Sequence, residues 1–152
     1  MKKIPQGFTT LTPCVAVKEG KAAIALYEKA LGAVTQYCMM IPDTNKVSHA
    51  CIKIGNSLFF LFDENKEMGS FAPGPQGSSV GFYLYVDDPD AAHKKAVAAG
   101  MKELLAPQDM FWGDRMSAVQ DPYGYKWNFA AQVREVSPEE IEASVRKKWK
   151  AE

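Results

Sequence analysis

Extended and helical hydrophobic patterns follow one another in the same order twice along this chain. In the first half, residues 8–17 have the pattern of a strand, and apolar residues at helical spacing predict a helix over 22–31. Three extended segments follow at 34–41, 46–54 and 57–62, separated by turn-forming residues. The first half is therefore expected to form a β-α-β-β-β unit.

The second half repeats this order. Residues 80–86 predict a strand and residues 91–99 a helix. Three more strands are predicted at 101–105, 114–120 and 125–131. The chain thus contains two units of the same type in tandem.

Residues that start and stop helices support both units. Gly32 and Gly100 follow the two helical patterns, where glycine adopts the left-handed cap conformation most readily. Asp88 is placed as an N-cap and Pro89 as the first helical residue. The sequence at 121–124, Asp-Pro-Tyr-Gly, predicts the last hairpin turn.

Landmarks of the two units also share one spacing. Gly124 lies 69 residues after Gly55, and Val86 lies 69 residues after Val17. A repeated module places its turn residues at matching points, so this spacing indicates an internal duplication.

The length of 152 residues predicts a single domain over 1–152. We expect the first module at 8–63, a Gly-, Pro- and Ser-rich linker at 64–79 and the second module at 80–132. A C-terminal helix is predicted at 138–150, outside the repeat.

The C-terminal helix has an apolar stripe. Ser137 and Glu140 form a capping-box pattern, and Ile141, Val145 and Trp149 then follow at four-residue steps. This stripe either packs on the same chain, the usual arrangement, or docks on a second subunit.

Charge and cysteine content exclude several classes of protein. The chain has 18 Lys and Arg against 18 Asp and Glu, a balance that argues against nucleic-acid or membrane partners. No apolar run suggests a signal peptide or a membrane span. Cys14, Cys38 and Cys51 are odd in number, have no recognised spacing and lie in apolar segments, so we expect reduced, buried thiols and a cytoplasmic protein.

Several reaction templates are missing. The sequence has no Gly-x-Ser-x-Gly elbow, no Walker phosphate loop and no Rossmann glycine fingerprint. These absences argue against a hydrolase of that type, a P-loop enzyme and a doubly wound methyltransferase.

Three segments carry a family resemblance. The sequences at 23–32 (AIALYEKALG), 111–115 (FWGDR) and 121–127 (DPYGYKW) resemble the vicinal oxygen chelate superfamily, which includes glyoxalases, bleomycin-resistance proteins and extradiol dioxygenases. The last two resemble its PhnB-like branch, often labelled demethylubiquinone methyltransferase-like. The resemblance covers 8–132 and implies an α+β fold, in which two tandem β-α-β-β-β modules form cupped mixed sheets, here followed by the C-terminal helix.

The resemblance also implies a divalent metal held by four side chains inside the cup. These positions fall on Thr12, Phe59 or Phe60, Gly81 and Asn128, and a shift of one residue supplies no better donor. None is His, Asp, Glu or Cys, the donors that a catalytic metal needs. We therefore expect neither metal nor cofactor.

Aromatic residues of the strands are expected to line the cup instead, although each one can equally fill the core. Alternation places Trp112 and Asp114 on one face of a strand and Arg115 on the other. Arg115 either binds a carboxylate or phosphate of a ligand or pairs with Asp121 or a carboxylate across the sheet. The predicted ligand-binding residues are Thr12, Phe59, Phe60, Trp112, Asp114, Arg115, Trp127 and Asn128.

The two histidines have simpler interpretations. His49 and Cys51 share a strand face and resemble half of a zinc site, but a partly buried histidine that donates to backbone is favoured because further ligands are missing. His93 lies beside Lys94 and Lys95 and is expected to be solvated.

Two main functions follow. The first is a metal-free protein that binds a small, partly apolar or aromatic molecule, and the resemblance implies a homodimer. The alternative is an isomerase, lyase or dioxygenase whose divalent metal uses ligands not identified here. A third, weaker hypothesis is a member that has lost its activity and serves as an assembly surface.

Overall fold

The structure, a computed structural model, describes residues 3–149. Its elements follow the predicted order of two β-α-β-β-β modules and a last helix. The first module consists of β1 (Cys14–Val17), α1 (Gly20–Leu31), β2 (Val34–Met40), β3 (Val47–Ile54) and β4 (Ser57–Asp63). After the short turn η1 (Lys66–Met68), the second consists of β5 (Gly81–Tyr85), α2 (Pro89–Ala98), β6 (Lys102–Asp109), β7 (Asp114–Gln120) and β8 (Lys126–Gln132), followed by α3 (Pro138–Trp149).

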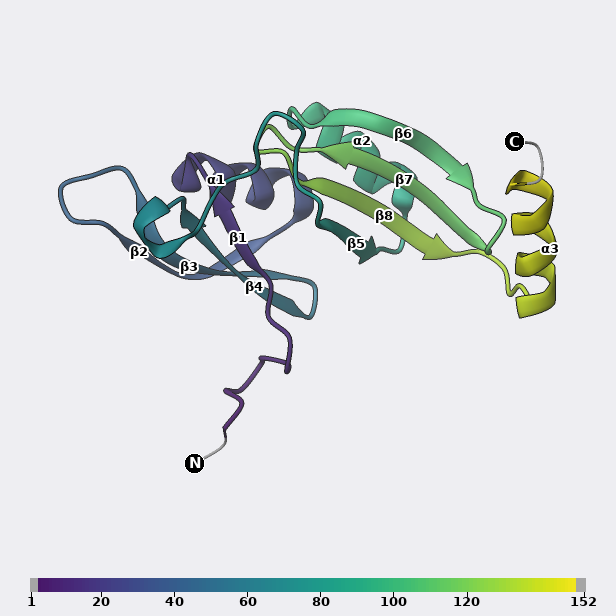
Figure 1. The fold of residues 1–152 in the computed structure, drawn as a ribbon, viewed down its shortest axis with the longest axis horizontal. Coiled ribbons are helices and arrows are strands. Elements are labelled where there is room, and N and C mark those ends of the chain that lie inside the picture. The colour runs from purple at the N-terminus through teal and green to yellow at the C-terminus, as the bar shows by residue number, and fades with distance from the viewer. Residues whose placement is uncertain (1–2, 150–152) are drawn as a thin grey trace.

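Each module forms one mixed four-stranded sheet. The strand orders are β1-β4-β3-β2 and β5-β8-β7-β6, so the two sheets have the same topology. The first strand pairs in parallel with the last strand of its module, and the other pairs are antiparallel. The two sheets lie along the long axis of the molecule, and α3 lies at one end (Figure 1).

Alternation along each strand gives every sheet two different sides. On β4, Phe59 and Leu61 are buried, whereas Phe60 and Phe62 are half-buried. Helices α1 and α2 contact each other and the strands of their own modules. We call the side that carries Phe59 and its β8 counterpart Trp127 the helix side, and the opposite side the open side.

The two modules share one core. The Tyr27 hydroxyl of α1 donates to Asp121 Oδ2 in the second module (2.7 Å), and Trp127 Nε1 donates to the same oxygen (2.8 Å). The Tyr125 hydroxyl donates to the Ala16 carbonyl of β1 (2.9 Å). These buried bonds fix the second module against the first.

The predicted caps and turn are confirmed. Gly32 ends α1 in the left-handed conformation (φ 66°), and the Asp88 side chain accepts from Ala91 N (2.9 Å) with Pro89 at the first turn of α2. Gly124 N donates to the Asp121 carbonyl and closes the last hairpin (3.2 Å).

Several predicted bounds change. The first strand begins at Cys14 instead of residue 8, because its ladder with β4 starts at the Cys14–Phe60 pair and Pro13 has no N–H to extend it. Helix α1 begins two residues early, at Gly20. Strand β6 continues to Asp109, which pairs with Arg115 of β7.

Two predictions about side-chain burial are wrong. Cys14 and Cys38 are exposed, and only Cys51 is buried as expected. His93 is 6% exposed instead of solvated, and its Nε2 lies 2.7 Å from Glu103 Oε2. The adjacent lysines suggested a polar helix face, but His93 shares its face with buried Ala96, one turn away.

Helix α3 stands apart from the modules. The Ser137 hydroxyl accepts from Glu140 N (3.2 Å), as the capping pattern predicted, and Arg134 forms an ion pair with Glu140 (2.9 Å). Within residues 3–149, α3 contacts no other helix or strand, and Trp149 is 66% exposed. Residue 150, the predicted end of this helix, lies outside the described residues. None of the described helices is long and apolar enough to span a membrane.

Candidate functional site

The open side of the second sheet contains one buried carboxylate among aromatic and thioether groups. Asp114 Oδ2 accepts from the Tyr83 hydroxyl (2.8 Å) and from Trp112 Nε1 (3.2 Å). The Tyr83 hydroxyl also lies 3.6 Å from Met116 Sδ. We call these four residues the Asp114 cluster.

Local sequence explains how the cluster forms. Gly113 has φ 102°, and a Cβ there would collide with the carbonyl oxygen of Arg134, so glycine is required at this turn. The Gly113 N–H donates to the Met110 carbonyl (3.0 Å) and tightens the turn. Trp112 precedes β7, so this turn rather than strand alternation holds it beside Asp114, the neighbour that the sequence predicted.

The Tyr83 hydroxyl remains protonated at neutral pH. Burial raises the pKa of Tyr83 to about 12, and its hydrogen bond to Asp114 acts in the same direction. Tyr83 is therefore a neutral donor to the carboxylate rather than a base.

The open side of the first sheet is an aromatic surface around His49. Its ring centroid lies 4.6 Å from Phe60, 5.8 Å from Tyr37 and 6.4 Å from Phe62. Phe8, from the segment before β1, lies 5.5 Å from Phe60. His49 is half-buried, as expected, but in the described chain no hydrogen bond joins its ring to backbone.

Neither His49 nor Cys51 forms a zinc site here. Across residues 3–149, no three His, Cys, Asp or Glu side chains lie close enough together to hold a metal ion. Burial raises the pKa of the Cys51 thiol, which disfavours the thiolate form that ligation and nucleophilic attack both need.

The four positions that the resemblance assigns to a metal do not fit one. Thr12 precedes β1, and the Cys14–Phe60 pairing places Phe60 rather than Phe59 on the open side. Gly81 has no side chain, and Asn128 donates through Nδ2 to the Phe82 carbonyl (2.9 Å). One hydroxyl and one amide oxygen cannot replace charged or imidazole ligands.

Phe59 and Trp127 lie in the shared core instead of the open side. They are 6% and 1% exposed, and their ring centroids are 6.3 Å apart. Trp127 is further fixed by its bond to Asp121. These two rings join the modules and have no access to a ligand on the open side.

Arg115 forms structural ion pairs on the helix side. Its guanidinium donates twice to Asp90 of α2 (2.5 and 2.7 Å) and once to Asp109 of β6 (2.9 Å). The bond from Arg115 holds the pKa of Asp90 below its usual value. Of the two predicted roles, the geometry supports pairing with a carboxylate across the sheet.

The structure thus places four predicted residues on or beside the open sides: Phe60, Trp112, Asp114 and Asn128. Thr12 lies in the segment before β1. Residue-by-residue reasoning missed Tyr37, Phe62 and Tyr85. For Phe62 and Tyr85 the signal was period two, because Phe62 follows Phe60 by two residues and Tyr85 follows Tyr83 by two.

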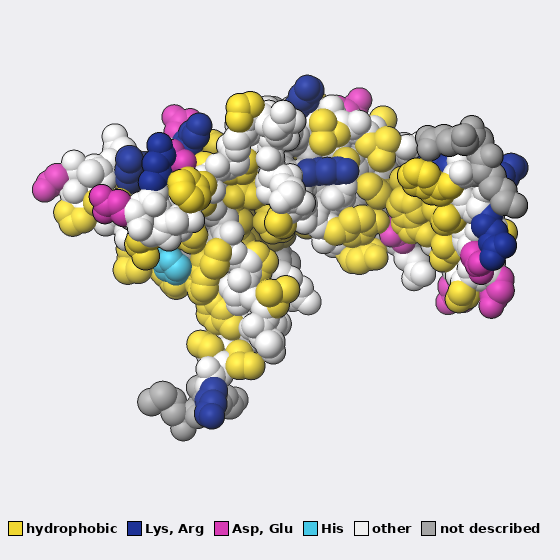
Figure 2. Space-filling model, viewed as in Figure 1, with side chains coloured by type: hydrophobic (Ala, Val, Ile, Leu, Met, Phe, Trp, Pro, Cys, Tyr) yellow, Lys and Arg dark blue, Asp and Glu magenta, His cyan; other side chains and the backbone are white. Residues whose placement is uncertain are grey.

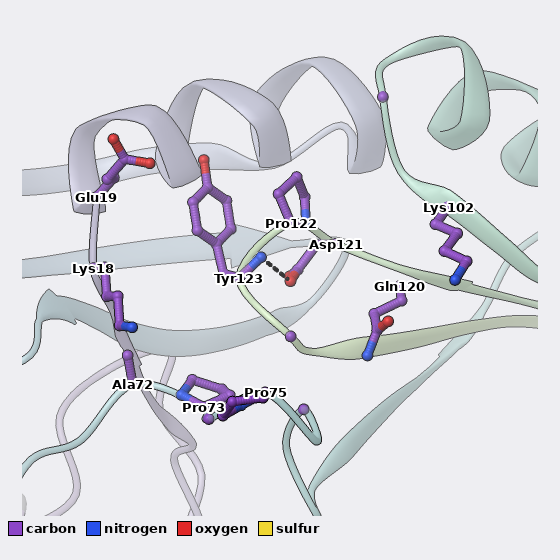
Figure 3. Close-up of a pocket in the computed structure, with 14 residues that line it drawn as sticks. Lys18, Glu19, Ala72, Pro73, Pro75, Lys102, Gln120, Asp121, Pro122 and Tyr123 are labelled. Atoms are coloured by element: carbon purple, nitrogen blue, oxygen red, sulfur yellow. Dashed lines mark hydrogen bonds between the residues drawn. The ribbon is translucent and has the colours of Figure 1, made fainter.

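A separate groove of about 560 Å³ lies where the modules meet. Lys18, Gln120 and Lys102 extend their side chains from three segments, above a wall that contains Pro73 and Pro75 (Figure 3). Asp121 also lines this groove, but both of its carboxylate oxygens already accept hydrogen bonds from buried protein groups. None of the eight predicted ligand-binding residues lines it.

Comparisons with known proteins agree with this architecture. A family model of the glyoxalase/bleomycin resistance protein/dioxygenase superfamily matches residues 9–129. An uncharacterised protein of Mycobacterium tuberculosis is 35% identical over 139 residues, which cover 89% of this chain and 81% of that protein.

Solved structures share the fold. A gene product from Arabidopsis thaliana superposes with a TM-score of 0.63 at 26% identity, over 82% of this chain and 98% of that one. A PhnB protein from Bacillus cereus superposes with a TM-score of 0.62 at 14% identity, over 80% of this chain and 98% of that one. With two sheets of matching topology and a family model that spans both modules, the chain belongs to the glyoxalase/bleomycin resistance protein/dioxygenase superfamily.

Proposed function

We propose that this protein binds a small, flat and partly apolar molecule on the open sides of its sheets, without a metal ion. The observation that carries the proposal is the aromatic lining of both open sides. Tyr85 is 71% exposed, and its ring centroid lies 5.4 Å from that of Tyr83. The aromatic rings around His49 cover the open side of the first sheet. Such surfaces supply large, rigid walls for a ligand.

The donor set supports a metal-free site. A Lewis-acid mechanism needs several charged or imidazole ligands with one open position. Thr12 and Asn128 supply neutral oxygens, and the other two positions supply a ring and a hydrogen atom. An isomerase, lyase or dioxygenase that depends on a divalent metal would have to assemble its ligands elsewhere.

We further propose that two copies of the chain face each other and enclose the ligand. Large apolar side chains are exposed on both open sides and along α3, including Tyr37, Met39, Tyr83, Tyr85 and Trp149. Hydrophobic side chains gather over the middle of the face shown in Figure 2 and again beside α3. Burial of one such side chain stabilises by about 1.5–3 kcal/mol, so several together can offset the cost of association.

A cytoplasmic location belongs to the same proposal. The three cysteines are unpaired, and Cys14 and Cys38 are exposed. Exposed unpaired thiols persist best where the compartment is reducing. Fractionation of cells with an antibody to this chain tests the location, and recovery from an oxidising compartment would contradict it.

The binding proposal is tested by calorimetric titration with 1-naphthalenemethanol, a neutral flat probe. We expect saturable binding that Tyr85→Ser weakens by about tenfold, since one aromatic wall is lost. Phe71→Ser is the matched control, because Phe71 is also exposed but lies in the linker between the sheets. Equal weakening by both variants would contradict the proposal, as would failure of the wild-type protein to bind this probe or a charged probe of the same shape.

A further inference from the structure

We propose that the Asp114 cluster recognises a positively charged group, a protonated amine or amidinium, carried by the flat ligand. The inference rests on the proposed function and names its ligand class. Asp114 is 7% exposed, so its carboxylate has lost most of its water while facing the open side. A desolvated charge of this kind requires compensation.

Within the described part of the chain, Asp114 is compensated by neutral donors alone. The Tyr83 hydroxyl and Trp112 Nε1 both bond to Oδ2. Among residues 3–149, no donor bonds to the second oxygen, Oδ1. Within the described residues the carboxylate therefore has no cationic partner, and its second oxygen remains a free acceptor.

Arg115 and Arg134, which lie on segments next to Asp114, are both engaged elsewhere. Arg115, the next residue along β7, points to the helix side and pairs with Asp90 and Asp109. Arg134 pairs with Glu140 and donates to the Phe111 carbonyl (3.3 Å). Neither guanidinium neutralises Asp114.

The rings around Asp114 suit the same kind of ligand. Trp112 and Tyr83 flank the carboxylate, and Tyr85 extends the surface. The faces of Trp and Tyr rings attract cations, more strongly when water is excluded. Because the pKa of Tyr83 lies near 12, its ring carries no charge at neutral pH.

Charge distinguishes the candidate ligands. Enclosure of a neutral ligand would remove the remaining water from the carboxylate and leave the charge uncompensated. An anionic ligand would add repulsion to that cost. A cationic group can form a charge-assisted hydrogen bond with Asp114 Oδ1 and, at the same time, contact the faces of the Trp112 and Tyr83 rings.

The test is a calorimetric comparison of three probes of one shape: 1-naphthylmethylammonium, 1-naphthalenemethanol and 1-naphthoate. Wild-type protein is expected to bind the cation at least about tenfold more tightly than the alcohol, and the carboxylate least. Asp114→Asn, which keeps the side-chain volume, is expected to abolish the preference for the cation while retaining affinity for the alcohol. Asp87→Asn, an exposed carboxylate with no hydrogen bond or ion pair within residues 3–149, is the control for net charge.

The outcomes separate this inference from the proposed function. Equal affinity for cation and alcohol in wild-type protein overturns the inference but leaves the aromatic site standing, whereas binding of no probe overturns both. If Asp114→Asn does not fold, as judged by circular dichroism, wild-type protein is titrated with naphthylmethyl-trimethylammonium and with its uncharged tert-butyl isostere. A preference of at least about tenfold for the charged isostere supports the inference, and equal affinity overturns it.

Discussion

Asp121 bonds to groups of both modules. It is 4% exposed and accepts four hydrogen bonds, from the Tyr27 hydroxyl, Trp127 Nε1 and the backbone N–H groups of Tyr123 and Tyr125. Two of these bonds shape the last hairpin, and the bond from Tyr27 crosses to α1. The same carboxylate thus fixes a turn and an interface.

We predict that Asp121→Asn lowers the free energy of unfolding by about 2–4 kcal/mol, because an amide nitrogen then faces buried donors. Urea denaturation followed by tryptophan fluorescence measures the change. Asp87→Asn is the control and is expected to change it by less than about 0.5 kcal/mol. Equal effects of the two variants would contradict this role of Asp121.

Tyr27 makes stability dependent on pH in the alkaline range. Burial, and then the charge of Asp121, raise the pKa of Tyr27 well above the ordinary value of 10.0. The folded state therefore keeps the Tyr27 proton above pH 10, whereas the unfolded chain releases it. The stability that the protonated Tyr27 hydroxyl contributes is fully present below pH 10 and is lost as the pH rises further. The free energy of unfolding should fall above about pH 10.

The variant Tyr27→Phe has no such proton. We predict that its unfolding free energy falls less steeply above pH 10 than that of wild-type protein. The two slopes should differ by about 1.4 kcal/mol per pH unit, the value for one proton. Urea titrations at several pH values compare the two slopes. Identical slopes would show that Tyr27 does not carry the effect.

At the scale of elements, helix α2 depends on its cap. The Asp88 carboxylate satisfies the Ala91 N–H at the helix start. We predict that Asp88→Ala costs about 1 kcal/mol of stability by chemical denaturation. The neighbouring change Asp87→Ala removes an equal charge without a cap, and a similar loss there would contradict the assignment.

The elements also show what the sequence can and cannot predict. The C-terminal end of α1, the N-cap of α2 and the last hairpin turn were predictable, because Gly32, Asp88 and the 121–124 turn act through local backbone chemistry. The start of α1 has no side-chain cap and was predicted two residues late. The start of β1 was not, because it depends on where the distant strand β4 can pair. Burial of His93 was open to prediction from helical spacing, but its charged neighbours along the sequence indicated solvent instead.

The candidate site was predicted in part for the same reason. The sequence predicted Trp112 beside Asp114 and opposite Arg115, and the structure has this arrangement, although Trp112 lies in a turn before β7 where strand alternation does not apply. Alternation could not choose between Phe59 and Phe60, since that choice needs the register of β4 against β1. Trp127 was predicted to line the cup, because its burial against α1 of the other module depends on tertiary packing that the local sequence does not reveal.

At the scale of the whole molecule, the exposed apolar surfaces predict self-association. Val145→Ser with Trp149→Ser removes most of the α3 stripe, which contacts no described helix or strand of its own chain. We predict a weaker dimer by sedimentation equilibrium, with the unfolding free energy of the dilute monomer unchanged within about 0.5 kcal/mol. A monomeric wild-type protein at all concentrations would contradict the dimer, and an equally tight variant would exclude α3 from its interface.

We have proposed that the aromatic open sides bind a ligand without a metal ion. This proposal is tested most directly by titrating 1-naphthalenemethanol into protein stripped with a chelator, into untreated protein and into protein supplied with zinc, nickel, iron or manganese, with the bound metal measured in each sample. We predict one affinity in all samples and less than about a tenth of an equivalent of bound metal in the untreated protein. Binding that is lost on chelation and restored by one equivalent of a divalent metal would contradict it.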